Sequence, residues 1–166
     1  MIATEISPRD LFYSLIDKPK LVYVQDMGDL RGTYDINQDL ISISVKEEDF
    51  ENFWSTVYHE YFHKLFFHYQ LQHNYLLDDA DEEPFGEIVC EMGAAYICEQ
   101  TGIYDKTMDH HIKYITGWLS VLRNPFLLME IVTVVLAMVE NLFQKNLCWM
   151  DLPPEVFALV YEKMDG

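Results

Sequence analysis

Two histidines and a glutamate in the pentad His59-Glu60-Tyr61-Phe62-His63 have the spacing of a hydrolytic metal site. The surrounding segment is typical of a helix, and side chains at positions i and i+4 of a helix lie one above the other on the same face. Both imidazoles can therefore reach one metal ion, and the glutamate between them can take a proton from a water bound there. The spacing predicts His59 and His63 as metal ligands and Glu60 as the catalytic base.

A zinc enzyme of this kind needs a third protein ligand and keeps one coordination position for water. Residues 87–91 read Glu-Ile-Val-Cys-Glu and offer two more carboxylates at i and i+4. We expect Glu87 to bind the metal and Glu91 to accept the N–H of a ligating histidine, which fixes the tautomer of that ring. The reverse assignment fits the same spacing, and two such glutamates can also simply face solvent. Small residues follow at 93–95 and predict close packing of this helix against another.

The order of these and further motifs resembles the zincin-like metallopeptidase domain of plasmid antirestriction proteins of the ArdC type. The resemblance begins at Gly-Thr-Tyr-Asp of residues 32–35 and Leu-Ile-Ser-Ile of 40–43, and it includes the pentad. It continues through residues 87–98 with the following Thr-Gly-Ile, and through Asp-His-His-Ile-Lys-Tyr-Ile-Thr-Gly-Trp-Leu of 109–119. The similarity covers roughly residues 30–145, in the family's order.

The resemblance implies a gluzincin-type site in which His59, His63 and Glu87 hold Zn²⁺ and Glu60 is the catalytic residue. The implied reaction is hydrolysis of a peptide bond in a protein or peptide substrate. Members of the family commonly carry an N-terminal domain that binds single-stranded DNA, and 166 residues leave no room for it. We therefore do not expect antirestriction activity by coating DNA.

The resemblance also aligns His111 and Tyr114 with a histidine and a tyrosine of the family. Attack on a peptide carbonyl creates an oxyanion that needs a hydrogen-bond donor as well as the metal. His111 and Tyr114 are thus the expected catalytic donors. A histidine and a tyrosine on an amphipathic helix more often serve packing or face solvent, so both interpretations remain open.

Hydrophobic patterning places short strands before long helices. Strands are predicted at residues 20–25 and in a hairpin of 32–35 and 39–45 with its turn at 35–38. Helices are predicted at residues 8–17, about 48–69, 85–100, 109–122, 126–146 and 154–164, with an acidic loop at 78–83. This order predicts one α+β domain over residues 1–166 with a zincin-like fold, in which a small N-terminal β-sheet precedes a mainly helical part.

The strand at residues 40–45 has two interpretations. It can lie at the edge of the sheet, where an extended peptide could add by main-chain hydrogen bonds, or it can be an ordinary inner strand.

The balance of 11 Lys+Arg against 28 Asp+Glu gives a net charge of −17, which disfavours direct nucleic-acid binding. Residues 1–10 lack the apolar core of a signal peptide, and the apolar stretch 126–143 is too short and too charged for a membrane span. Cys90, Cys98 and Cys148 fit free thiols in a reducing compartment, so we expect a cytoplasmic protein without membrane contact.

The sequence thus predicts a zinc metallopeptidase that cuts a specific protein target and is encoded by a plasmid, phage or other mobile element. The alternative is a non-catalytic acidic protein that binds a restriction enzyme or regulator and keeps zinc for folding. Glu60 favours the enzyme, because a purely structural zinc site needs no base and is commonly closed by four protein ligands.

Overall fold

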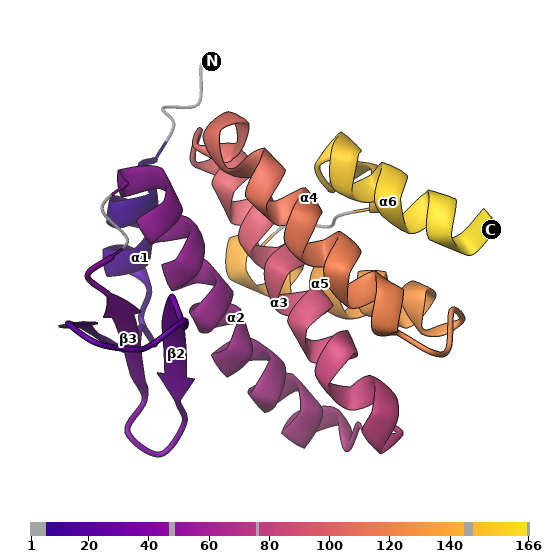
Figure 1. The fold of residues 1–166 in the computed structure, drawn as a ribbon, viewed down its shortest axis with the longest axis horizontal. Helices are drawn as coiled ribbons and strands as arrows, with labels where there is room; N and C mark the ends of the chain where they lie inside the picture. The colour runs from indigo at the N-terminus through magenta and orange to yellow at the C-terminus, as the bar shows by residue number, and fades with distance from the viewer. Residues whose placement is uncertain (1–5, 47–48, 76, 145–147, 166) are drawn as a thin grey trace.

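The computed structural model describes residues 6–46, 49–75, 77–144 and 148–165, without the side chain of Trp149 (Figure 1). Its elements are α1 (Pro8–Ser14), β1 (Lys20–Val24), β2 (Gly32–Asp35), β3 (Leu40–Ser44), α2 (Phe50–His73), α3 (Asp79–Gln100), α4 (Tyr104–Val121), α5 (Leu127–Phe143), the 3₁₀ turn η1 (Trp149–Asp151) and α6 (Pro154–Asp165). A small sheet followed by helices confirms the predicted α+β class. The assignment of residues 1–166 to one domain stays a prediction.

Three parts of the sequence predictions lie outside the described residues. These are residues 1–5 of the segment expected to carry no signal peptide, the predicted helix start near residue 48, and the predicted helix end at residues 145–146. The other predicted helices and strands are present with shifted ends.

The sheet has the strand order β1-β3-β2, with β3 at its centre. β2 pairs antiparallel to β3, Gly32 opposite Ile43 and Asp35 opposite Leu40, which confirms the predicted hairpin. β1 pairs parallel to β3, with Lys20 opposite Leu40. The interpretation of residues 40–45 as an edge strand is therefore wrong, because β1 covers the side of β3 that β2 leaves open. The edge that faces the helices belongs to β2.

Helix α2 packs against this sheet through the buried side chains of Ile41 and Ile43 and contacts both β2 and β3. The helix starts after Asp49, whose Oδ1 accepts the N–H groups of Glu51 and Asn52 at 3.0 and 3.3 Å. A carboxylate at this position satisfies free donors of the first turn and suits the helix dipole. The capped start fixes the rotation of α2, and with it the face that carries the pentad.

Helix α3 lies at the centre of the helical part, in contact with α2, α4 and α5 (Figure 1). Every residue from 88 to 98 is buried. A Cβ at Gly93 would overlap the Phe62 ring of α2, and one at Gly86 would lie 3.3 Å from Phe66 Cε1. The small residues thus let the two helices approach closely, as the sequence predicted, and this brings their polar side chains together.

The predicted acidic loop at residues 78–83 is wrong. Most of that segment forms the first turns of α3, because carboxylates at a helix N-terminus are favoured by the helix dipole. Asp81 is buried there, and its Oδ1 accepts the Arg123 N–H at 2.7 Å, which ties the start of α3 to the end of α4.

Two further predictions concern the cysteines and the apolar segment. Cys90, Cys98 and Cys148 are free, and the first two are buried in α3. The apolar stretch forms α5, whose residues Leu128 and Val135 are buried against the rest of the molecule. None of the described helices has the length and apolar character that crossing a membrane requires.

Candidate metal centre

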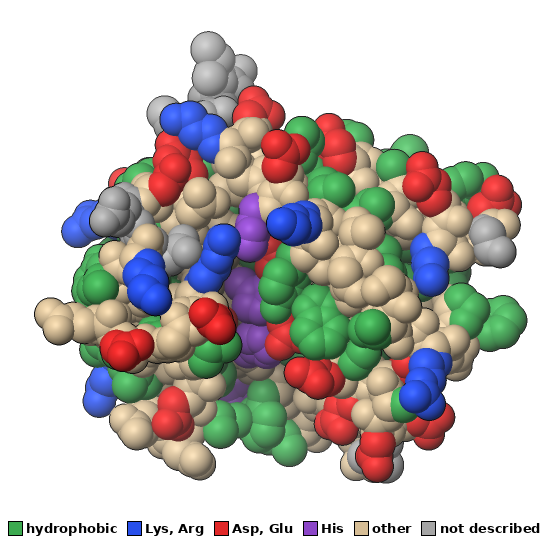
Figure 2. Space-filling model, in the orientation of Figure 1, with side chains coloured by type: hydrophobic (Ala, Val, Ile, Leu, Met, Phe, Trp, Pro, Cys, Tyr) green, Lys and Arg blue, Asp and Glu red, His purple; other side chains and the backbone are tan. Residues whose placement is uncertain are grey.

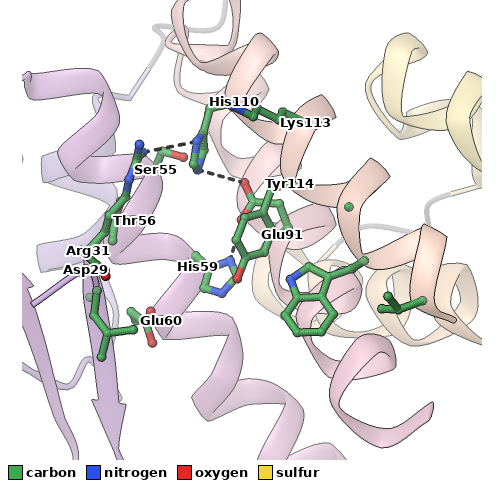
Figure 3. Close-up of a pocket in the computed structure, with 15 residues that line it drawn as sticks. Asp29, Arg31, Ser55, Thr56, His59, Glu60, Glu91, His110, Lys113 and Tyr114 are labelled. Carbon is green, nitrogen blue, oxygen red and sulfur yellow. Dashed lines mark hydrogen bonds and ion pairs between the residues drawn. The ribbon is translucent and has the colours of Figure 1, made fainter. Parts of the chain in front are cut away.

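Three neighbouring helices each bring polar side chains to one point, which lies in a groove between the sheet and the helices. Helix α2 contributes the pentad, α3 contributes Glu87 and Glu91, and α4 contributes Tyr114. Figure 3 shows the side chains of His59, Glu91 and Tyr114 converging between the helices, with Glu60 next to the strands.

The potential ligand atoms of His59, His63 and Glu87 form a compact triangle. His59 Nε2 lies 3.2 Å from His63 Nε2 and 3.1 Å from Glu87 Oε2, and His63 Nε2 lies 3.4 Å from Glu87 Oε1. Tetrahedral zinc with bonds of 2.0–2.1 Å needs donors about 3.3 Å apart. Two imidazoles and a carboxylate at this spacing fit a zinc ion with one remaining position.

Glu60 lies beside the same point. Its carboxylate and the nitrogens of His59 and His63 lie within 4.8 Å of one another, so these three groups could also surround a metal ion. The separations to Glu87 are shorter, and they favour Glu87 as the third ligand. With Glu87 as the ligand, the Glu60 carboxylate would lie next to a bound ion without coordinating it and could act as a base.

The carboxylate of Glu91 holds the far side of the His59 ring. His59 Nδ1 donates to Glu91 Oε2 at 2.6 Å, so that Nε2 faces His63 and Glu87. The second oxygen of Glu91 accepts from His111 Nδ1, also at 2.6 Å. Glu91 is 2% exposed, and a buried carboxylate held by two donors fixes the ring orientation rigidly.

The groove continues on both sides of this centre as two pockets of about 650 and 580 Å³. Both are lined by Leu30, Gly32, His59, Glu60 and Tyr114. A Cβ at Gly32 would lie 3.2 Å from Glu60 Cγ, so the glycine lets the edge strand β2 approach the pentad. Figure 2 shows histidine side chains at the bottom of this groove. The candidate metal centre thus lies in the middle of an open cleft along a strand edge.

A comparison with protein-family models matches the chain to the zincin-like metallopeptidase family MPTase-PolyVal over residues 18–128, about two thirds of its length. The chain belongs to this family. Neither curated proteins nor solved structures give a match. The matched range includes the sheet and helices α2, α3 and α4, and so every side chain of the zincin-like centre.

In the zincin-like centre, the pKa values of His59 and Glu87 are shifted in opposite directions. Burial disfavours the charged form of His59, but its hydrogen bonds with Glu87 and Glu91 outweigh burial and raise its pKa to about 10. Burial opposes ionisation of Glu87 as well, yet His59 and His63 hold its pKa well below the usual range. Without a metal, the His59 ring therefore carries a second proton and a positive charge at neutral pH. A metal ion would replace that proton.

Burial has the opposite outcome for Glu60. This side chain is 7% exposed, and burial raises the pKa of its carboxyl above the usual value although His59 and His63 lower it. A carboxylate with a raised pKa is a stronger base and transfers protons more readily near neutral pH.

Tyr114, expected as a catalytic donor, lies beside the centre. Its hydroxyl donates to Glu87 Oε2 at 2.7 Å, and its ring stands edge-on to His59 with the centroids 5.3 Å apart. Burial and the hydrogen bond to Glu87 raise the pKa of the hydroxyl, so it stays protonated and remains a donor.

His111 does not face the cleft, so its expected contact with a substrate oxyanion requires correction. The side chain is fully buried, with Nδ1 on Glu91 and Nε2 3.0 Å from Thr107 Oγ1. Neither ring nitrogen remains for a substrate, and His111 instead holds Glu91 in place. The adjacent His110 lines the cleft.

Sequence reasoning missed His110, and it also missed Arg31 and Lys113, which line the same pocket. A usable signal was present in α4. Its buried residues include Thr107, His111, Ile115 and Leu119, four apart in sequence, which places His111 on the packed face.

Proposed function

We propose that the chain is a zinc-dependent metallopeptidase that hydrolyses a peptide bond in a specific protein target. The observation that carries the proposal is the triangle of His59, His63 and Glu87 donors with Glu60 beside it in an open cleft. Two nitrogens and one oxygen at tetrahedral spacing suit zinc better than the harder ions Mg²⁺ and Ca²⁺, which prefer more oxygen ligands. When bound, zinc would supply a Lewis acid that makes a water molecule acidic near neutral pH.

Three side chains have separate roles in the proposed reaction. Glu60 accepts the proton of the attacking water and then donates it to the leaving amine, which its raised pKa favours. Glu91 keeps the Nε2 atom of His59 directed at the metal. The Tyr114 hydroxyl, which donates to Glu87 here, could turn to the substrate oxyanion once Glu87 held a metal, and we assign it as the oxyanion donor.

Strand β2 gives the substrate a place to bind. Among the described strands it pairs only with β3, so its other edge has main-chain groups available along the cleft. An extended peptide can add to such an edge by main-chain hydrogen bonds, and this presents one of its carbonyl groups to the centre. Because Gly32 has no side chain, the edge of β2 and Glu60 lie close enough to contact the same peptide.

A specific target is part of the proposal because an unrestricted peptidase would damage the cell that makes it. The free thiols support a cytoplasmic location, and the net charge of −17 argues against direct nucleic-acid binding. The resemblance to ArdC-type proteins supports an origin on a mobile element. The rival, an acidic binding protein with structural zinc, finds support in the same charge, but it gives Glu60 and the open cleft no role.

The proposal is tested by digesting a proteome-derived peptide library and identifying new peptide termini by mass spectrometry. Three samples are compared: the zinc-loaded chain, the chain stripped with a chelator, and the stripped chain reloaded with zinc. We expect new termini with the first and third samples and none above a mock purification with the second. Identical termini with and without zinc, or no cleavage by a zinc-loaded chain, would contradict the proposal.

A further inference from the structure

The two sides of the cleft differ in charge. The pocket on one side of the metal centre is lined by Arg31, His110 and Lys113. The pocket on the other side is lined by Glu82 and Glu83 instead. Figure 2 shows blue Lys and Arg side chains on both banks of the groove at one end of the row of histidines. The chain has 11 Lys+Arg against 28 Asp+Glu, so a cluster of cations at one site is not expected from composition alone. We call the cations Arg31 and Lys113, together with the ring of His110, the cationic flank.

The His110 ring offers a hydrogen-bond donor to the pocket that it lines. Arg31 Nη1 lies 3.3 Å from His110 Nδ1, and a guanidinium can only donate, so Nδ1 accepts and the neutral ring carries its proton on Nε2 (Figure 3). His110 Nε2 is 3.9 Å from Glu91 Oε1, beyond hydrogen-bonding distance. That N–H is thus available to an acceptor that enters the pocket.

Lys113 extends the flank at the mouth of the pocket. It is exposed on α4 one turn after His110, and among the described residues its ammonium has no ion pair or hydrogen bond. Asp29 is the acidic side chain on the same rim, while Glu60 and Glu91 lie at the floor and belong to the metal centre. The rim therefore offers the His110 N–H and the Lys113 ammonium against the carboxylate of Asp29, and the pocket favours an anionic group.

Local charges decide which substrates enter. A net charge of −17 repels acidic peptides in general, but salt screens charges beyond about 8 Å at physiological ionic strength. A group inside the pocket therefore interacts mainly with the cationic flank. The pocket adjoins His59 and Glu60, and successive residues of an extended peptide advance by only about 3.3 Å, so the group belongs to a residue close to the scissile bond.

We propose that the cationic flank binds a carboxylate of the substrate and so selects an acidic residue on one side of the scissile bond. This inference rests on the proposed peptidase function. A carboxylate can come from an Asp or Glu side chain or from a free C-terminus. The first source makes the protein an endopeptidase with acidic preference, and the second makes it a carboxypeptidase.

A binding experiment tests the pocket without relying on turnover. The zinc-loaded, ¹⁵N-labelled chain is titrated in NMR with N-acetyl-glutamate α-amide, N-acetyl-glutamine α-amide and N-acetyl-glutamine with a free C-terminus. We expect one or both carboxylate probes, but not the neutral amide, to shift the amide signals of Arg31, His110 and Lys113. The carboxylate probe that binds more tightly identifies the source. Equal shifts with the neutral probe would overturn the inference.

Matched variants separate the pocket from the metal and from the overall charge. Lys113→Glu is expected to weaken the carboxylate probe about fivefold. Lys163→Glu makes the same charge change on the exposed end of α6, outside the residues lining the pocket, and is expected to leave the affinity unchanged. Equal effects of both variants, or none from Lys113→Glu, would show that the carboxylate responds to net charge or to the metal, and would contradict the inference.

The peptide digest then distinguishes failure of the inference from failure of the function. Cleaved peptides are expected to be enriched in Asp and Glu on one side of the new termini, with the enrichment lost in Lys113→Glu and kept in Lys163→Glu. Zinc-dependent cleavage without acidic enrichment overturns the inference and leaves the peptidase proposal standing. Selective carboxylate binding without any cleavage does the reverse, since it supports the pocket and contradicts the peptidase.

Discussion

Glu60→Gln is expected to lower kcat/KM for peptide hydrolysis by about 10²–10⁴-fold while the bound metal stays unchanged. Glutamine keeps the size of the side chain but cannot accept the proton of a water molecule. The triangle of His59, His63 and Glu87 donors does not include Glu60, so metal binding should survive the change. The rate is measured on a peptide identified in the library digest, and metal content is measured by mass spectrometry on the same samples.

Glu162→Gln is the matched control, because it makes the same chemical change on an exposed position of α6. It should retain the full rate and the full metal content. Loss of metal from Glu60→Gln would mean that Glu60 itself is a ligand, which its position within 4.8 Å of both histidine nitrogens permits. An unchanged rate would remove Glu60 as the base, and with it the main argument for an enzyme.

The second large effect is expected from Glu91→Ala, which should lower the free energy of unfolding by about 3–5 kcal/mol. The change leaves the buried donors of His59 and His111 without their acceptor. It also frees the His59 ring to turn, so we expect metal affinity to fall about 10–100-fold. Stability is measured by urea unfolding of the metal-free proteins, and affinity by competition with a chromophoric chelator.

The pH dependence of this effect has a defined sign. Burial opposes ionisation of Glu91, but His111 and His59 hold its pKa well below the ordinary 4.5. A carboxyl whose pKa is lowered by folding stabilises the protein above its unfolded pKa and loses that contribution as the pH falls. The stability difference between the parent and Glu91→Ala should therefore be full near pH 7 and shrink below about pH 4.5. Glu162→Ala, at an exposed position, should cost little at any pH, and equal stability of both variants would refute the role of Glu91.

Local patterns predicted the elements that carry the ligands. The i, i+4 spacings of the pentad and of Glu87 and Glu91 require only that each segment be a helix, and both are. The hairpin was also predicted from short-range signals, which are the polar turn at residues 35–38 and the alternation of apolar residues with serines in residues 40–44. These predictions succeeded because hydrogen bonding within a helix or a hairpin depends on neighbours in sequence.

Features set by distant contacts could not be predicted in the same way. The parallel pairing of β1 with β3 placed β3 in the centre of the sheet, and no pattern inside residues 40–45 indicates which strands flank it. The acidic residues 78–83 fit either a loop or a helix start by sequence, and in the structure Asp81 contacts the N–H of Arg123, far along the chain, within the first turn of α3.

The choice between two adjacent histidines was also a tertiary matter. A residue step turns a helix by about 100°, so His110 and His111 cannot both face the cleft. Packing of Ile115 and Leu119 turns His111 inward to Glu91 and leaves His110 beside Arg31. The cationic flank joins this helix to a loop before β2, and no single segment of the sequence contains it.

The most direct test of the metal centre is the metal content per chain, measured by mass spectrometry on protein purified without an affinity metal. The matched sample is the double variant His59→Ala, Glu87→Ala, whose fold is checked by circular dichroism. The site predicts about one zinc per parent chain and none in the folded double variant. A parent chain that holds no metal after zinc is offered at neutral pH, or a double variant that holds as much as the parent, would contradict it.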